Sequence, residues 1–363
     1  MAVALQIRRA RESLRLPLEK AAEQLNLAAD KLRAWEEGKQ EPSFDDLCDL
    51  ADVYHRSVDF FLRDIAPPKS PLSLRLARGR RQLSPEAEAV CVRWVELCRW
   101  RSELEETLGR KRPPSLPECP ASLDPTDMAR DVRTRLRIGS GPIENLRTLL
   151  EKQGIYVFML PLPKGELSGC SRWDERYAPA ILVNARDDSG RRNFSMAHEY
   201  YHLLVHPKEA HGCGVEITAE PGEERSANRF AATFLMTREG LAAALRERER
   251  RGHPRRAKDY APLAADWHVS AQALLYALKD FGLMPPQEAD RLIDEWATLK
   301  LPLRWPKGKP RPTLWDRYVQ QLGEPYTHAA LAAYREGHIS LSKLAHYLGI
   351  DIRKARKATE ESR

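Results

Sequence analysis

The residues best suited to chemistry lie in His198-Glu199-Tyr200-Tyr201-His202, inside a stretch whose pattern is typical of a helix. Two histidines four residues apart share one helical face, one turn from each other, so both imidazoles can bind one metal ion. Zinc suits two neutral imidazoles and a carboxylate, with a fourth position open to water. Glu199 is then placed to act as a general base toward that water. The alternative is a surface helix that happens to carry two histidines.

A carboxylate ligand is expected about one helix further along the chain, at Glu224. The apolar residues from 227 to 235 recur at helical spacing, and Glu224 lies three residues before Ala227, at the start of that inward stripe. A carboxylate that faces a core is costly unless it is paired or bound to metal. Glu223 lies about 100° round the same helix and is expected to face solvent. The alternative is that both glutamates only favour a helix N-terminus.

Two further residues are candidates for the cleft beside such a metal. His206 extends the helical face of His202 by one turn, where it could line the cleft or polarise a substrate carbonyl. Tyr201 could donate a hydrogen bond to a tetrahedral intermediate. For both residues packing in the protein interior is the competing interpretation.

The region from about Asp124 to Met236 resembles the ImmA/IrrE family of zinc metallopeptidases. The likeness rests on two strand-like segments, on the approach to the histidines, on His206 and on a Glu-x-x-Ala-Asn-x-Phe-Ala motif. The strand-like segments are Gly154-Ile-Tyr-Val157 and Ala180-Ile-Leu-Val-Asn184, and the approach to the histidines is Arg191-Arg-Asn-Phe-Ser-Met-Ala197. Two departures from the family stand out: Tyr200-Tyr201 stands where Leu-Gly is usual, and Thr237 where proline is usual. Neither departure removes a ligand, but the first adds bulk beside the metal.

The resemblance implies a site and a substrate class. Carried over position by position, it implies His198, His202 and Glu224 as zinc ligands, in the manner of a gluzincin, and Glu199 as the base. It also implies that the substrate is a transcriptional repressor, cleaved to switch on a stress, phage or mobile-element response. The domain fold expected is α+β and zincin-like, with a small sheet.

The first 64 residues are predicted to be all-helical, as five short helices. The expected spans are 4–12, 17–25 and 28–37, followed by helices that open at Pro42-Ser43 and at Ser57. The short turn at Asn26-Leu27 has the spacing of a helix-turn-helix. Trp35-Glu36-x-Gly38 followed by Pro42-Ser43 makes the segment similar to the Xre/Cro-type helix-turn-helix over its full length.

DNA contact by this module is expected at the start of its third helix, which enters the major groove in such motifs. The residues there are Ala29, Asp30, Lys31 and Arg33. Only Lys31 and Arg33 are natural partners of phosphate or guanine. The alternative is a helical module that dimerises or binds another protein.

Composition and charge bound the class of protein. Of 363 residues, 42% are hydrophobic, which allows two or three domains with real cores. The net charge of +7 favours an acidic partner such as nucleic acid. Six cysteines without a Cys-x-x-Cys spacing indicate neither a disulfide framework nor a zinc ribbon. No run approaches a membrane span, so we expect a cytoplasmic protein with reduced thiols and no membrane partner.

Proline-rich stretches suggest the boundaries of four segments. We expect a helix-turn-helix domain over 1–64, a linker with a long helix over 65–123, a metallopeptidase domain over 124–284 and a helical C-terminal region over 285–363. The long helix is expected to start at Ser84-Pro85, as a core helix or as the contact of a homodimer. The segment 339–350 has another helix-turn-helix pattern, too short by itself to predict DNA binding.

The sequence therefore predicts a multidomain protein with two functions: a DNA-binding helix-turn-helix module followed by a zinc-dependent endopeptidase. A tethered DNA-binding module would raise the effective concentration of the protease beside a DNA-bound repressor. The alternative from another class is a transcriptional regulator, or the antitoxin of a toxin–antitoxin pair, in which the peptidase fold senses or binds but does not cut. The presence of Glu199 argues against that alternative, because a zinc-binding scaffold has no use for a general base there.

Overall fold

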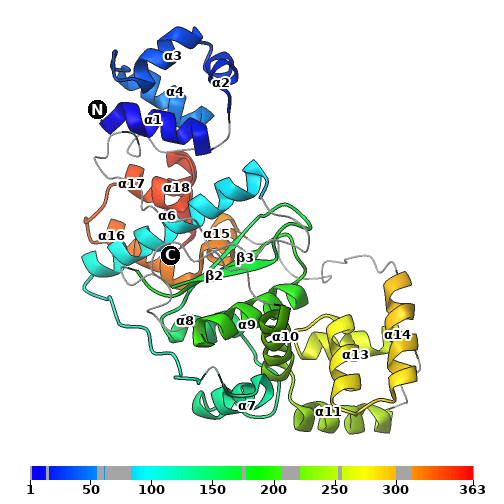
Figure 1. Ribbon diagram of the computed structural model, residues 1–363. Coiled ribbons are helices and arrows are strands. Elements are labelled where there is room, and N and C mark those ends of the chain that lie inside the picture. The colour runs from blue at the N-terminus through cyan, green and yellow to red at the C-terminus, as the bar shows by residue number, and fades with distance from the viewer. Residues whose placement is uncertain are drawn as a thin grey trace. The chain divides into compact units, whose positions relative to one another are not determined.

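The computed structural model describes residues 2–13, 16–54, 61, 83–120, 122–173, 177–205, 221–251, 256–299 and 313–362. The chain divides into two compact units. The first comprises Met1–Ser70 and Leu76–Glu96, and the second comprises Pro71–Arg75 and Leu97–Arg363. Figure 1 labels most of the elements of the two units.

The first unit contains four short helices in its described part. They are α1 (Ala2–Ser13), α2 (Leu18–Gln24), α3 (Ala29–Glu36) and α4 (Phe44–Val53). The turn between α2 and α3 passes through Asn26 at a positive φ of 52°, a conformation that asparagine tolerates better than most residues. Arg11 of α1 forms an ion pair of 2.6 Å with Glu36 of α3, over a core that contains Leu32 and Trp35. Four of the five predicted helices are thus present; the one expected from Ser57 lies almost entirely outside the described residues.

A long helix, α6 (Pro85–Thr107), begins in the first unit and ends in the second. Ser84 caps its start, because the backbone N–H of Ala87 donates to Ser84 Oγ at 3.2 Å. The start of this helix was predicted at Ser84-Pro85, and the structure confirms it.

The second unit is built on a three-stranded mixed sheet. Its strands are β1 (Tyr156–Leu160), β2 (Gly169–Arg172) and β3 (Ala180–Asn184), in the order β1-β3-β2. β1 runs parallel to β3, with Tyr156 opposite Ala180, whereas β2 runs antiparallel to β3, with Gly169 opposite Val183. β2 is therefore an edge strand within the described part of the sheet.

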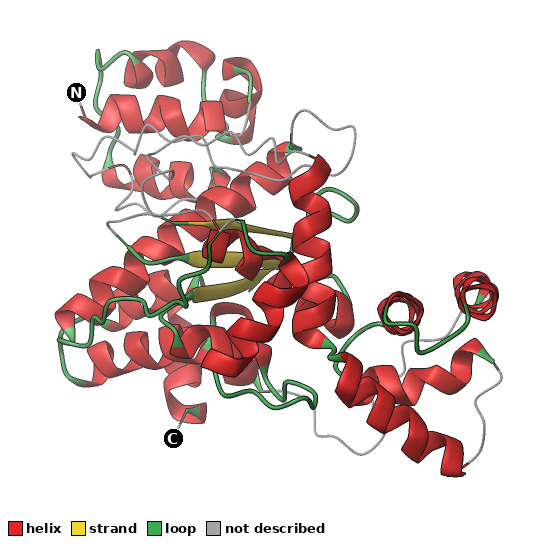
Figure 2. Cartoon of the chain, turned by 60° about the horizontal axis from the view of Figure 1, so that its bottom comes forward, coloured by secondary structure: helices red, strands yellow, loops and turns green. Residues whose placement is uncertain are grey.

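Both faces of the sheet are covered by helices (Figure 2). Val157 and Ile181 belong to the large core that includes Met196 and Ala197 of α9 (Ser189–Val205). The alternate residues face the other way: Phe158 makes an edge-on contact with Tyr326 at 5.7 Å between ring centroids. Tyr156 donates a 2.6 Å hydrogen bond to Glu105 of α6 on that same side. A sheet buried on both faces explains why every residue of β1 and β3 is apolar or buried.

Further helices belong to this unit. They are α7 (Pro125–Arg135), α8 (Leu146–Lys152), α10 (Pro221–Leu235), α11 (Arg238–Arg251), the 3-10 helix η2 (Ala257–Tyr260), α12 (Ala261–Asp266), α13 (Ala271–Asp280) and α14 (Pro286–Thr298). α10 packs between α7 and α9, and α13 packs on α14. Of the described helices, none combines the length and apolar character that a membrane crossing needs. The five cysteines within the described ranges are free thiols.

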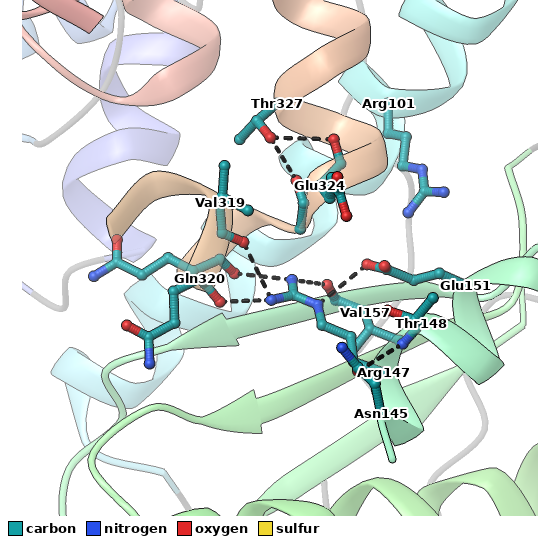
Figure 3. Close-up of polar contacts among 12 residues, drawn as sticks. Arg101, Asn145, Arg147, Thr148, Glu151, Val157, Val319, Gln320, Glu324 and Thr327 are labelled. Carbon is teal, nitrogen blue, oxygen red and sulfur yellow. Dashed lines mark hydrogen bonds and ion pairs between the residues drawn. The ribbon is translucent and has the colours of Figure 1, made fainter. Parts of the chain in front are cut away.

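The C-terminal helices are α15 (Leu314–Leu322), α16 (Glu324–Arg335), α17 (Leu341–Leu348) and α18 (Ile352–Glu361). A buried arginine joins them to the sheet (Figure 3). Arg147 of α8 donates to the carbonyls of Val319 and Gln320 at the end of α15, at 3.3 and 2.5 Å, and to Val157 of β1 at 2.5 Å. It also forms a 3.1 Å ion pair with Glu151. The guanidinium therefore satisfies carbonyls that the end of a helix leaves without partners.

The expected fold class is confirmed: an N-terminal helical helix-turn-helix, a mixed α+β region with a three-stranded sheet, and a helical C-terminus.

Candidate metal centre

The loop before α9 is held by one buried amide. Asn184, the last residue of β3, accepts hydrogen bonds at Oδ1 from the backbone N–H groups of Leu162 and Arg186, at 3.1 and 3.0 Å. Its Nδ2 donates to the carbonyl of Leu167 at 3.1 Å. Asp188 then accepts from the backbone N–H of Arg191 at 2.9 Å and caps the first turn of α9. The end of β3 thus fixes where α9 begins.

The first turn of α9 lies against the backbone of the turn between α12 and α13. A Cβ on Gly190 would overlap the backbone of Val269 and Ser270, in the turn between α12 and α13. Glycine is needed here for close approach of the two backbones. This contact sets the depth at which α9 enters the core.

The two histidines of the motif lie together in the interior, as their spacing predicts. His198 is 8% exposed and His202 is 2% exposed. Their ring centroids are 5.3 Å apart. A histidine pair so deeply buried is unlike a surface helix that carries two histidines by chance.

Glu224 of α10 completes a three-residue group with these histidines. One candidate ligand atom from each of His198, His202 and Glu224 lies within 4.8 Å of the other two. His198 Nε2 lies 3.5 Å from Glu224 Oε2. Two donors on one tetrahedral zinc ion, each at about 2.0–2.1 Å, are separated by about 3.3 Å. The donor types and this spacing therefore fit zinc.

A polar side chain of α10 lies near the Nδ1 atom of each imidazole. His198 Nδ1 lies 2.8 Å from Asn228 Oδ1, and His202 Nδ1 lies 3.4 Å from Glu223 Oε1. An acceptor at Nδ1 fixes the tautomer in which Nδ1 carries the proton and Nε2 has the lone pair that a metal needs. The expectation that Glu223 faces solvent is wrong: its side chain is 23% exposed, less than the 36% of Glu224, and its carboxylate is turned toward His202.

Glu199 is buried beside the edge strand of the sheet. It is 4% exposed, and Ser171 of β2 donates a 2.8 Å hydrogen bond to Glu199 Oε2. A Cβ on Gly169 of β2 would lie 3.3 Å from Glu199 Cγ and 3.1 Å from the Leu182 carbonyl oxygen. The absence of a side chain at Gly169 therefore lets the strand approach the carboxylate closely.

The two tyrosines between Glu199 and His202 point to different surroundings. Tyr200 is fully buried and donates to Gln153 Oε1 at 2.6 Å, and burial raises its pKa. The Tyr201 ring packs edge-on against His202, at 5.4 Å between centroids. It also contacts Phe230 at a tilted angle. Burial also raises the pKa of Tyr201, so its phenol stays protonated and able to donate. His206 lies outside the described residues.

The predicted DNA-contacting residues lie at the start of α3, with their charges partly matched. Arg33 forms a 2.5 Å ion pair with Asp30, and both side chains are exposed. Lys31 lies 3.5 Å from Asp46 of α4 and 4.9 Å from the centroid of the Trp35 ring. Ala29 is half-buried. α3 therefore presents less net positive charge than its lysine and arginine alone suggest.

Three residues of the site were not found from sequence. Asn228 lies one turn after Glu224 on the same helix, and this i, i+4 spacing is a signal that could have identified it. Ser171 and Gly169 carry no such signal. They reach Glu199 only because β2 pairs with β3 and packs on α9.

Two parts of the chain match the models of known domain families. Residues 150–279 match the IrrE N-terminal-like domain of the M78 peptidases. Residues 2–59 match a helix-turn-helix domain. No protein of curated function matches the chain. The first match spans all three residues of the metal group, and the second spans α1 to α4.

Proposed function

We propose that this chain, which joins an IrrE N-terminal-like domain of the M78 peptidases to a helix-turn-helix domain, is a zinc-dependent endopeptidase that cuts a protein substrate. The observation that carries this proposal is the convergence of His198, His202 and Glu224 within 4.8 Å, next to a buried Glu199. Two imidazoles and one carboxylate are a donor set of catalytic rather than structural zinc sites, because they leave a position for water or substrate.

Some residues of the site would hold the ion, and others would orient those ligands. His198 and His202 bind through Nε2, and Glu224 binds through a carboxylate oxygen. Asn228 Oδ1 lies 2.8 Å from His198 Nδ1, and Glu223 Oε1 lies 3.4 Å from His202 Nδ1, whereas Glu224 lies against His198 Nε2. These positions support the assignment of Glu224 rather than Glu223 as the ligand. Acceptors of this kind fix the ring orientation and make the imidazole a better ligand.

When bound, zinc supplies a Lewis acid for the scissile carbonyl and a water of lowered pKa. Glu199 takes a proton from the attacking water and then donates it to the amine that leaves. The hydrogen bond from Ser171 holds Glu199 Oε2, so the carboxylate keeps one orientation during both transfers. Tyr201, beside His202, and His206 remain predictions as donors to the carbonyl oxygen.

An extended peptide is the form of substrate that this site favours. β2 pairs only with β3 among the described strands, and we propose that a peptide strand pairs with its other edge. Ser171 on β2 contacts Glu199, which places that edge beside the base. A peptide added to β2 would have its backbone aligned by hydrogen bonds near the reacting groups.

The substrate proposed is a transcriptional repressor, whose cleavage switches on a stress, phage or mobile-element response. The helix-turn-helix domain supports this choice, because DNA binding would raise the effective concentration of the enzyme near a DNA-bound substrate.

Zinc binding and peptide hydrolysis test the proposal together. Zinc affinity is measured by competition with a chromogenic chelator, and cleavage by mass spectrometry of a library of unstructured peptides. We expect Glu224→Gln to lose zinc and cleavage, and Glu199→Gln to keep zinc but lose cleavage. Zinc binding of wild-type strength in Glu224→Gln would overturn the metal centre. Hydrolysis that persists in Glu199→Gln would overturn the base. Zinc binding by the wild-type chain without cleavage of any peptide or protein would support a regulator that does not cut.

A further inference from the structure

The last two helices form a second helix-turn-helix, at the C-terminal end of the second unit. α17 ends at Leu348 and α18 begins at Ile352, so three residues separate them. Gly349 occupies the left-handed region (φ 69°, ψ 40°), and the backbone N–H of Ile350 donates to the Ala345 carbonyl at 2.9 Å. A turn of three or four residues that contains glycine is typical of this motif.

Side-chain caps and a small apolar core fix the geometry of the pair. Ser340 Oγ accepts from the backbone N–H of Lys343 at 3.2 Å, and Asp351 Oδ1 accepts from that of Lys354 at 2.9 Å. Both helices therefore start at a defined residue. The inward face of α18 carries Ala355 and Ala358, both fully buried. Small residues there allow α18 to lie close to its neighbours, with its opposite face turned outward.

The outward face of α18 is basic over its first two turns. Arg353, Arg356 and Lys357 are exposed and share one side of the helix, at spacings of three and four residues. Lys357 lies 3.7 Å from Glu361, whereas the guanidinium groups of Arg353 and Arg356 have no ion-pair partner in the part of the chain that the structure describes. Ile352, at the start of the helix, is 50% exposed.

A further pair of helices in the same chain has a similar turn but a different distribution of charge. α12 and α13 are also joined by a short turn with a left-handed residue, His268 at φ 54°. Yet α13 carries one lysine and one aspartate and no arginine. Its Lys279 forms a 2.5 Å ion pair with Asp290 of α14. α13 therefore carries little unpaired positive charge, whereas α18 combines the short turn with an exposed basic face.

We infer that α18 is a nucleic-acid recognition helix that contacts duplex DNA in the major groove. The motif places the first residues of its second helix against base edges, and these are the residues that are basic here. Arg353 and Arg356 have the donors that pair with guanine or phosphate, and the exposed Ile352 suits contact with a thymine methyl group. Within α18 the acidic residues Glu360 and Glu361 lie at its far end, and Asp351, directly before the helix, forms a 2.9 Å ion pair with Lys354.

The inference is tested on the full chain with the N-terminal module weakened. In a Lys31→Ala/Arg33→Ala background, duplex DNA is selected from a random library, and binding of a labelled 30-base-pair duplex is followed by fluorescence anisotropy. The test variant is Arg353→Ala/Arg356→Ala/Lys357→Ala. The matched control is Lys152→Ala/Lys164→Ala/Lys258→Ala, which removes the same charge from exposed positions of the same unit.

We expect the α18 variant to bind duplex DNA at least tenfold more weakly and the control less than twofold. The slope of log affinity against log salt should fall in magnitude by about 0.9 for each phosphate contact that is lost. Arg353→Lys/Arg356→Lys, which keeps the charge, should keep most of the affinity and lose base preference. Equal weakening in the control would overturn the inference, as would an α18 variant that binds like wild type. Tighter binding to single-stranded RNA of equal length would also overturn it.

Discussion

At the scale of single residues, the candidate site depends on which nitrogen of each histidine would bind a metal ion. Asn228 and Glu223 lie against the Nδ1 atoms of His198 and His202, and Glu224 lies against His198 Nε2. The sequence left Glu223 and Glu224 as alternatives. The structure separates their positions, because one helical step of about 100° turns them toward different histidines.

Removing the amide of Asn228 should weaken zinc binding without removing a ligand. We expect Asn228→Ala to lower zinc affinity roughly 10–100-fold, because His198 loses the acceptor that fixes its tautomer. Asn228→Asp keeps an acceptor and should keep wild-type affinity. Competition with a chelator measures both. Equal affinity in Asn228→Ala and wild type would show that the contact has no role in metal binding.

Ser171 should affect catalysis but not zinc. Ser171→Ala removes the hydrogen bond to Glu199 Oε2, and a bond to a charged group contributes about 1.5–3 kcal/mol. We therefore expect kcat to fall about tenfold or more with unchanged zinc affinity, and Ser171→Thr to restore most of it. Loss of zinc in Ser171→Ala would mean that the serine supports the fold of the site instead.

At the scale of elements, helical periodicity predicted α9 and α10 and the side chains that they bring inward. It could not predict what lies across from them. Ser171 is 28 residues before Glu199, and their contact depends on the pairing of β2 with β3. The docking of α15 on β1 depends on Arg147, whose partners lie more than 170 residues later in the chain. Such long-range contacts have no local pattern in a sequence.

The buried arginine of α8 is expected to be the main polar link between the sheet and the C-terminal helices. Its pKa is lowered by burial, and burial also raises the pKa of its partner Glu151. Arg147→Met would leave Glu151 without its ion-pair partner and the α15 carbonyls without a donor. Breaking a buried pair in this way costs about 3–5 kcal/mol.

Hydrogen exchange of the α15 amides measures this effect, because α15 should open at lower denaturant in Arg147→Met. Gly323 gives a second test at the same place. A Cβ there would lie 2.6 Å from Glu151 Oε1, and the residue has a positive φ of 93° that alanine disfavours. Gly323→Ala should therefore loosen the same contact. Wild-type protection of α15 in both variants would contradict the link.

At the scale of the whole molecule, the chain forms two compact units, and the three candidate ligands His198, His202 and Glu224 lie in the second. A ligand that binds only the folded state stabilises the unit that holds it, by about 4.1 kcal/mol at 1,000 times its dissociation constant. We therefore expect a zinc chelator to raise hydrogen exchange in α9 and α10 and to leave α1 to α4 unchanged. Equal loss of protection in both units would mean that they do not unfold independently.

The most direct test of the central claim compares the host's proteome with and without the catalytic base. Protein N-termini are profiled quantitatively in cells that carry the wild-type chain or Glu199→Gln, during normal growth and after DNA damage. The account predicts new N-termini in one or a few DNA-binding proteins, present with the wild type and absent with Glu199→Gln, while both chains bind zinc. Identical profiles under both conditions, with zinc bound in both chains, would contradict it.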